Sequence, residues 1–258
     1  MEPSVKMNIN GDLAEITLHR PDKYNSFTRE MSFLLQEKLD ECADEKIRAV
    51  VITGSGRAFS AGQDLKEVLE TGNKGLRNIL SEQLNPIIIK IRNLEKPVLA
   101  AVNGVAAGAG ANIALACDIV VAAKSAGFIQ AFSKIGLIPD SGGTYFLPRL
   151  IGLQKATALM MLGENISAEE AERIGMIYKV FPDESFKEEV SKLANLLASL
   201  PTKALSLTKR ALLDSSGNTL IQQLTLEDQL QATAADSEDF SEGVKAFVEK
   251  RKPVYKGK

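Results

Sequence analysis

Apolar and polar residues alternate over residues 5–19, and Asn10-Gly11 in the middle of this stretch is a dipeptide typical of tight hairpin turns. After Thr28 the apolar residues recur instead at intervals of three and four, which is the spacing of one helix face. We therefore predict a strand pair over residues 5–19. A helix that Thr28 caps is expected to follow and to run to about Cys42.

Three short runs further along the chain are almost wholly apolar, as is typical of strands buried on both faces. They cover residues 49–53, 97–102 and 119–122. Helical patterns separate them, one beginning near residue 64, one over 76–94 and one over 109–116. Strands that alternate with helices predict βαβ units around a mainly parallel sheet, and hence an α/β fold.

Beyond Pro139 the strand signals nearly stop, and residues 177–180 alone suggest a short strand. The helices expected there cover residues 143–150, 155–162, 167–174, 184–198, 202–215, 220–235 and 237–250. We divide the chain into an α/β body, residues 1–195, and an all-helical tail, residues 196–258. Because the tail carries many apolar residues, it must be buried against the body or against a neighbouring subunit.

Composition limits the classes of partner. The chain has 258 residues, of which 45% are hydrophobic and 25% charged, and its formal net charge is −2. Without a basic field, nucleic acid is a poor candidate for a partner, and no apolar run is long enough to span a membrane. The first residues carry no export signal, and Cys42 and Cys117 form no metal-type pair. We expect a cytoplasmic protein.

Histidine occurs once, as His19 at the end of the early strand pair. A serine or cysteine hydrolase would have to take its base from this residue, and a histidine cluster that binds metal is impossible. A surface position at a strand end is the simpler interpretation of His19. Any chemistry is therefore expected to rest on carboxylates and backbone amides.

Two segments, 57–66 and 96–112, each place small residues at the junction between a predicted buried strand and a helix. The first N–H groups of a helix have no partners within it, and small side chains let a ligand oxygen approach them. If the two segments meet, they form an oxyanion hole. The alternative is that their glycines only make tight turns. A dinucleotide site at Gly108-x-Gly110 is disfavoured because position 113 is Ile rather than Gly.

One ordered set of motifs runs through the chain: Asn25-Ser26, then residues 57–66, 97–118, 136–144, 162–171 and 242–251. This set resembles the crotonase family of enoyl-CoA hydratases and isomerases, from about residue 5 to the C-terminus. The resemblance implies the α/β crotonase (ClpP/crotonase-like) spiral of ββα units, with a helical C-terminal region that forms trimers, often paired as hexamers. It also implies a coenzyme A thioester as substrate, and no metal or redox cofactor.

The resemblance also assigns roles to residues. The backbone N–H groups of Gln63 and Ala109 would hold the thioester oxygen. Lys23, Tyr24, Ala61, Asp64 and Leu65 would lie along the CoA, and Lys250 and Arg251 would reach its phosphates across a subunit boundary. For these last two residues, a solvated basic tail is the alternative. Residues 67–84 are expected to wall the acyl pocket.

Hydratases of this family hold a water molecule with two glutamates, and the matching positions here are Asn112 and Phe132. Neither side chain can accept a proton, and Phe132 would exclude water, so the resemblance argues against hydration. Asp140 resembles instead the acidic residue of the enoyl-CoA isomerases, and residues 132–140 resemble the ring-epoxide isomerases of phenylacetate catabolism. A carboxylate in an apolar pocket is suited to proton exchange. The alternative is a turn residue that caps the next helix.

The sequence thus predicts an isomerase that moves a double bond from the 3-enoyl to the 2-enoyl position of an acyl-CoA, or that rearranges a ring-epoxide phenylacetyl-CoA to an oxepin. Asp140 would exchange the proton while the oxyanion hole holds the enolate. Three alternatives are an enoyl-CoA hydratase, a relative that displaces a ring halide, and a non-catalytic CoA- or RNA-binding homologue. The halide reaction needs a histidine base, which no predicted site segment supplies.

Overall fold

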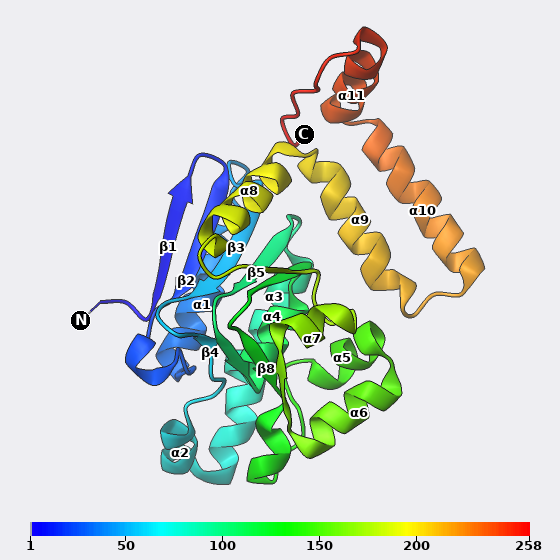
Figure 1. Ribbon diagram of the computed structural model, residues 1–258. Coiled ribbons are helices and arrows are strands. Elements are labelled where there is room, and N and C mark those ends of the chain that lie inside the picture. Colours follow the sequence, from blue (N-terminus) through cyan, green and yellow to red (C-terminus); the bar gives the residue numbers. More distant parts are fainter. Residues whose placement is uncertain (1) are drawn as a thin grey trace.

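The computed structural model describes residues 2–258, and the side chains of residues 71–76 lie outside that description. Among the described residues, the strands of the body form two sheets (Figure 1). The larger has the order β1-β2-β3-β5-β7-β10. Its strands are β1 (Val5–Asn10), β2 (Leu13–Leu18), β3 (Ala49–Gly54), β5 (Val98–Val102), β7 (Ile119–Ala123) and β10 (Lys179–Phe181).

The larger sheet is mainly parallel, as predicted. Strands β1 and β2 are antiparallel, whereas the pairs from β2 through β10 are all parallel. Gly11 joins β1 to β2 with φ +64°, a left-handed conformation that glycine adopts without steric cost. Helix α8 (Phe186–Ser199) packs against β2, β3 and β7. The predicted strand pair and βαβ organisation are confirmed.

The smaller sheet was missed by the sequence analysis. It has the order β4-β6-β8-β9, from β4 (Ala58–Ser60), β6 (Val105–Ala107), β8 (Gly127–Ile129) and β9 (Asn165–Ser167). Three residues are too few for a period of two to be recognised. Strands β4 and β6 pair in parallel, and each lies within one of the two small-residue segments. This sheet therefore brings those segments together.

Helix α1 (Arg29–Glu41) begins as predicted, because the Thr28 hydroxyl accepts the Met31 N–H at 3.3 Å. Helix α2 (Leu65–Asn78) passes through a π-helical segment (Ile79–Leu84) into α3 (Asn85–Asn93). The predicted start near residue 64 is confirmed. Residues 76–93 are helical as predicted, but they continue α2 instead of forming a separate helix. Pro86 has no N–H to donate, and the change of helix type occurs beside it.

The remaining helices begin and end close to the predicted bounds. They are α4 (Ala109–Ala116), α5 (Gly143–Ile151), α6 (Leu153–Leu162), α7 (Ala168–Arg173), α9 (Thr202–Ser215), α10 (Leu220–Ala235) and α11 (Glu238–Glu249). Short 3-10 helices cover Pro21–Lys23 and Ala131–Ile135. None of the helices in residues 2–258 is both long and apolar enough to cross a bilayer.

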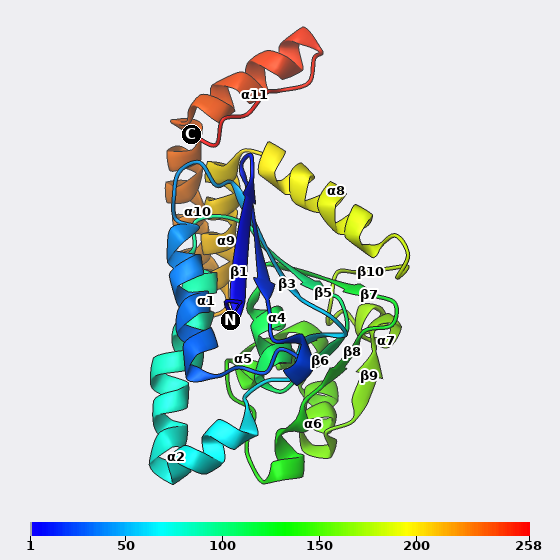
Figure 2. The ribbon, with the colours of Figure 1, turned by 90° about the vertical axis from the view of Figure 1, so that its left-hand side faces the viewer.

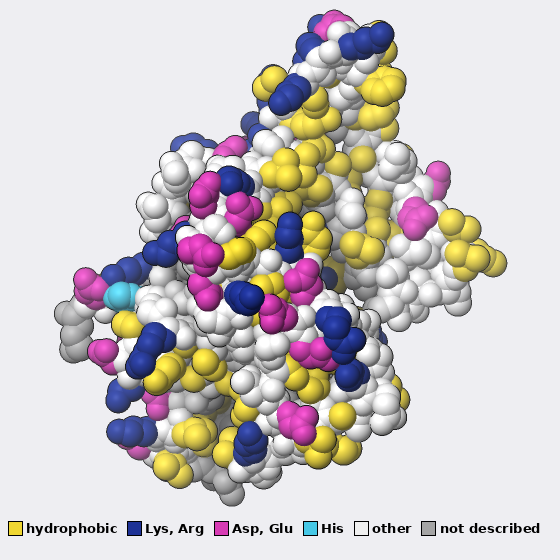
Figure 3. All heavy atoms as spheres, in the orientation of Figure 1, with side chains coloured by type: hydrophobic (Ala, Val, Ile, Leu, Met, Phe, Trp, Pro, Cys, Tyr) yellow, Lys and Arg dark blue, Asp and Glu magenta, His cyan; other side chains and the backbone are white. Residues whose placement is uncertain are grey.

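Helices α10 and α11 extend away from the body (Figures 1 and 2), whereas α9 packs against it, with the Lys209 Nζ donating to the Ile91 carbonyl at 2.7 Å. Leu230 is buried within this chain, but most large apolar side chains of the three helices are exposed. Figure 3 shows hydrophobic side chains gathered over the projecting helices. The exposed set is Leu212, Leu220, Ile221, Leu224, Phe240, Val244, Phe247 and Val248. The body therefore does not cover these faces, and the division between residues 195 and 196 stays a prediction.

Candidate active site

A cavity of about 810 Å³ opens where the two small-residue segments meet. Nine residues predicted from the sequence line it: Lys23, Tyr24, Ala61, Gln63, Asp64, Leu65, Ala109, Phe132 and Asp140. They come from the loop before α1, from the start of α2, from the start of α4 and from the segment between β8 and α5. The fold thus gathers side chains that are far apart in the sequence.

The two segments touch at Gly62. A Cβ atom on this residue would lie 2.8 Å from the Ala107 carbonyl oxygen and 3.2 Å from the Ala109 nitrogen. Gly62 also has φ +87°, which other residues rarely adopt. The N–H groups of Gln63 and Ala109 donate no hydrogen bond within the described part of the chain. With the dipole of α4 behind Ala109, this pair is suited to stabilise an oxyanion.

Asn25 holds the first segment in place. Its side chain is buried, and its Nδ2 donates to the carbonyl oxygens of Ser55 at 2.9 Å and Ala58 at 2.8 Å. The Ser60 hydroxyl donates to the Asn25 carbonyl at 2.8 Å, and the Ala61 N–H donates to Tyr24. Residues before α1 therefore lie directly against the residues that lead to Gln63. Asn25 belongs to one of the family motifs, but no pattern in the sequence indicates these contacts.

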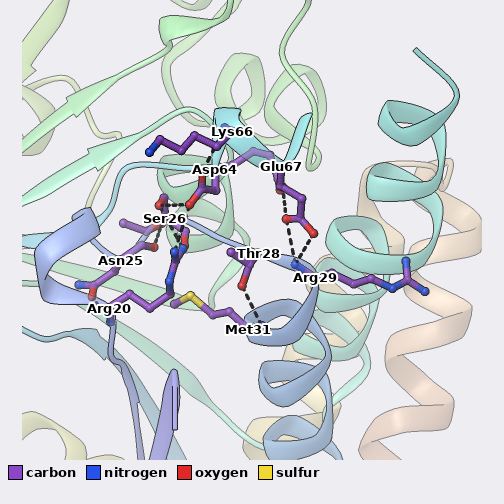
Figure 4. Close-up of polar contacts among 11 residues, drawn as sticks. Arg20, Asn25, Ser26, Thr28, Arg29, Met31, Asp64, Lys66 and Glu67 are labelled. Carbon is purple, nitrogen blue, oxygen red and sulfur yellow. Dashed lines mark hydrogen bonds and ion pairs between the residues drawn. The ribbon is translucent and has the colours of Figure 1, made fainter. Parts of the chain in front are cut away.

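Asp64 belongs to a polar cluster at the edge of the cavity (Figure 4). Its carboxylate pairs with Arg20 at 3.1 Å and accepts the Ser26 hydroxyl at 3.4 Å and the Lys66 N–H at 3.1 Å. Burial alone would raise the pKa of Asp64, but these hydrogen bonds lower it. Asp64 is thus held ionised at the start of α2. Sequence reasoning missed Arg20, which lies outside the motif segments.

Residues of α2 and the π-helical segment form the apolar wall of the cavity, as expected for residues 67–84. Val68, Leu69, Ile79 and Leu84 line it, whereas the side chains of 71–76 lie outside the described residues. Glu67 ties α2 to α1, since both of its carboxylate oxygens accept the Arg29 N–H at 3.0 Å (Figure 4).

Asp140 lies in the cavity wall before α5. Burial raises the pKa of its carboxyl group, and a hydrogen bond from the Ser141 hydroxyl at 2.8 Å counteracts part of this effect. Its backbone oxygen accepts the Gly143 N–H at 2.8 Å, so the main chain closes the turn. Among the described contacts, the carboxylate makes no bond to the α5 N-terminus. This arrangement speaks against the alternative that the Asp140 side chain caps the helix.

The positions that match the water-holding glutamates of hydratases are apolar or turned away from the cavity. Phe132 is 6% exposed and lines it. Asn112 is fully buried, does not belong to the described lining, and donates through Nδ2 to the Asp140 carbonyl at 2.8 Å. Of the acidic side chains in that lining, Asp22 is exposed and Asp64 is paired. Asp140 remains as the half-buried carboxylate.

Residues 8–258 match the enoyl-CoA hydratase/isomerase family. The chain belongs to this family. It is 47% identical over 247 residues to the 1,2-epoxyphenylacetyl-CoA isomerase of Escherichia coli K12, with 94% of each chain covered. It is 45% identical over 255 residues to a probable enoyl-CoA hydratase of Rhodobacter capsulatus, with 99% of this chain and 98% of the relative covered.

Solved structures of the family share the fold. An enoyl-CoA hydratase from Bacillus anthracis superimposes with a TM-score of 0.93 at 34% identity, over 99% of this chain and all (100%) of that one. The crotonase resemblance and the crotonase fold are therefore confirmed, and the protein is an enzyme of this family. Because hydratase and isomerase names occur at similar identity, the finer activity has to be argued from the site.

Three predicted features lie away from the cavity in this chain. Arg251 forms a bidentate ion pair with Glu242, at 2.6 and 2.8 Å, and Lys250 is exposed at the end of α11. Their contact with CoA phosphates stays a prediction that requires a neighbouring subunit. His19 follows β2, and its Nε2 lies 2.7 Å from a carboxylate oxygen of Glu2. It does not belong to the described lining of the cavity.

Proposed function

We propose that this enzyme is an acyl-CoA isomerase in which Asp140 carries a proton between two carbon atoms of the substrate. The observation that supports this proposal is the half-buried carboxylate of Asp140, whose pKa is raised. It faces the same cavity as the N–H groups of Gln63 and Ala109, which have no hydrogen-bond partner among the described residues. A carboxyl group of this kind is basic enough to accept a proton and acidic enough to return it.

The reaction needs two proton transfers. The Asp140 carboxylate removes a proton from C2 of the acyl group, which leaves an enolate whose oxygen accepts hydrogen bonds from the N–H groups of Gln63 and Ala109. The protonated Asp140 then returns the proton at C4, and the double bond moves from C3–C4 to C2–C3. No atom is gained or lost, and we propose that no metal or redox cofactor takes part.

We favour a ring-epoxide phenylacetyl-CoA as substrate, which the same site would rearrange to an oxepin with the enolate-type charge stabilised during epoxide opening. The relative at 47% identity carries the matching name, and the cavity wall is largely apolar. Lys23 and Lys66 line the cavity and would attract the CoA phosphates, beside Tyr24. A linear 3-enoyl-CoA is the second substrate that this chemistry suits.

Hydration is the rival activity, because a relative at 45% identity is named a probable hydratase. Asn112 and Phe132 give no carboxylate for a water molecule, and a non-catalytic CoA-binding function would not need a half-buried carboxylate at position 140. An assay of the purified enzyme with ring-epoxide phenylacetyl-CoA, 3-enoyl-CoA and 2-enoyl-CoA, followed by mass spectrometry, tests the proposal. We expect products of unchanged mass. A dominant product 18 Da heavier, the mass of one water, would favour the hydratase.

A further inference from the structure

The turn that carries Asp140 is held by the side-chain amide of Asn112. This residue lies in α4, three positions after Ala109, and is fully buried. Its Nδ2 donates to the Asp140 carbonyl oxygen at 2.8 Å, and the Gly143 N–H donates to the same oxygen at 2.8 Å. One helix therefore presents an oxyanion donor at its first residue and binds the Asp140 turn one helical turn later.

Gln130 fixes the orientation of this amide. Gln130 is 3% exposed, and its Nε2 donates to Asn112 Oδ1 at 2.7 Å. The Asp140 carbonyl can only accept a hydrogen bond, so Asn112 must turn its NH₂ group toward it and its oxygen toward Gln130. Gln130 Oε1 is then left buried with no partner in the described structure. The two amides therefore form a buried, directional pair that ends on the Asp140 carbonyl.

Gly143 and Ser141, which flank the Asp140 turn, also fit the contact between this turn and Asn112. A Cβ atom on Gly143 would collide with the Asn112 amide, so glycine is needed where Asn112 approaches α5. Ser141 is 2% exposed, has φ +50°, and donates to the Asp140 carboxylate. A residue other than glycine persists in this conformation only where its surroundings hold it firmly. The main chain and the carboxylate of Asp140 are thus held separately.

We propose that Asn112, oriented by Gln130, is a positioning residue that sets the place of the Asp140 carboxylate relative to the Gln63 and Ala109 N–H groups. The inference rests on the proposed function, in which Asp140 carries the proton. An amide is required at position 112 because a carboxylate could not donate to the Asp140 carbonyl. The same contact explains why position 112 does not serve a water molecule.

Asn112→Asp is the sharpest variant, because it keeps the shape of the side chain and the acceptor for Gln130 but removes the donor. We expect kcat for isomerisation to fall about 100-fold, the cost of a displacement of about 1 Å at a reacting group. KM should stay close to that of the parent, since the CoA contacts lie elsewhere. Gln130→Met, which removes the donor to Asn112, should lower kcat in the same direction by less.

Gln223→Glu is the matched control. Its Nε2 donates to the Ala211 carbonyl at 3.1 Å within the tail, so the same chemical change is made away from the cavity. This variant should keep the parent kcat. If Asn112→Asp does not fold, Gln130→Met and its pH profile decide the question.

Two measurements separate positioning from a merely structural role. The acid limb of the kcat/KM profile should move in both variants, because the carboxylate changes its surroundings. Exchange of the α-protons of phenylacetyl-CoA in D₂O, followed by NMR, should slow in parallel with kcat. A lowered Tm with unchanged kcat per folded enzyme and unchanged exchange would overturn the inference.

Asp140→Asn distinguishes this failure from a failure of the proposed function. If that variant keeps turnover, Asp140 is not the proton carrier, and both proposals fall. If it is inactive while Asn112→Asp and Gln130→Met keep full turnover, the positioning inference alone is wrong.

Discussion

At the scale of single residues, neighbouring positions 62 and 63 should respond very differently to the same substitution. Gly62→Ala places a Cβ atom against the Ala107 carbonyl and the Ala109 nitrogen, at a φ that alanine rarely adopts. We expect kcat to fall roughly 100- to 1,000-fold, as when one oxyanion donor is lost. Gln63→Ala keeps its backbone N–H and should stay within about tenfold of the parent. Steady-state kinetics of both variants would check this, and equal losses would mean that the Gln63 side chain is catalytic.

The pH dependence of the reaction should report Asp140. Because burial raises its pKa, the acid limb of kcat/KM should lie above about 3.9, the ordinary value for aspartate. Asp140→Asn keeps the shape of the side chain but carries no proton, so isomerisation should fall roughly 100- to 10,000-fold. Affinity for the product CoA ester should survive. A mutant that also loses this affinity would show that Asp140 holds the fold instead.

The ionised Asp140 carboxylate should also lower the free energy of unfolding. Its pKa is higher in the folded state than in the unfolded chain, so the folded state holds the proton more tightly. Its contribution is therefore most favourable below the ordinary carboxyl pKa and is lost as the pH rises through the raised value. At neutral pH, Asp140→Asn should therefore raise Tm, because the variant removes the cost of the ionised carboxylate. Thermal unfolding at pH 4 and pH 7 measures the difference, which should shrink at the lower pH.

The sequence identified the residues of the site better than it identified the residues that hold them. The family resemblance assigned roles to Gln63, Ala109 and Asp140, and the structure places all three at one cavity. Arg20 and Gln130 carry no such signal, since an arginine or glutamine shows its partner only after the chain has folded. Their contacts, to Asp64 and Asn112, join residues far apart in the sequence.

At the scale of elements, the two ends of α4 differ in what they contact. Its first residue faces the cavity, whereas Arg92 of α3 donates to the Ala116 carbonyl at its last residue and to Asp118 just beyond. Lys209 of α9 also pairs with Asp118, at 2.8 Å, and burial lowers the pKa of this lysine. This cluster therefore ties the helix that carries Ala109 to both α3 and the tail.

Asp118→Ala should destabilise the protein strongly, because it leaves two cations without their partner in a largely buried place. We expect a loss of about 3 to 5 kcal/mol, whereas Lys209→Met, which removes the buried charge itself, should cost less. Lys192→Ala, which breaks an exposed ion pair with Glu188, should have little effect. Urea unfolding at one protein concentration compares the three. Equal effects of Asp118→Ala and Lys192→Ala would contradict this account.

Elements with a long pattern could be predicted, and short ones could not. The periods of α9 and α10 extend over several turns, and their predicted bounds agree with the structure. The strands of the smaller sheet have three residues each and exist because their neighbours pair with them. The join between α2 and α3 through Ile79–Leu84 could not be predicted either. A π-helical segment shifts the apolar period without ending the helix, so the pattern resembles the start of a second helix.

At the scale of the whole molecule, the exposed apolar faces of the tail require a partner. Contiguous apolar surface of this kind marks an interaction site, and we propose that it is covered by further copies of this chain, as a trimer or a pair of trimers. The family resemblance predicted this assembly, and the structure of one chain adds that the body leaves Phe247 and Val248 of α11 uncovered. Assembly would also be needed to bring Lys250 and Arg251 to the CoA of a neighbouring subunit.

A charge on that face tests the assembly directly. Phe247 is 86% exposed, so Phe247→Glu disturbs no packing within the chain but places a carboxylate where an apolar contact is expected. Burying an unpaired charge in an interface costs several kcal/mol, enough to shift the protein toward monomers. Light scattering on the size-exclusion eluate should show a trimer or hexamer for the parent and smaller species for the variant, with the body still folded by circular dichroism. Lys187→Glu, on an exposed position of α8, should leave the assembly intact. A parent that elutes as a monomer, or a variant that stays trimeric, would show that the tail serves another partner.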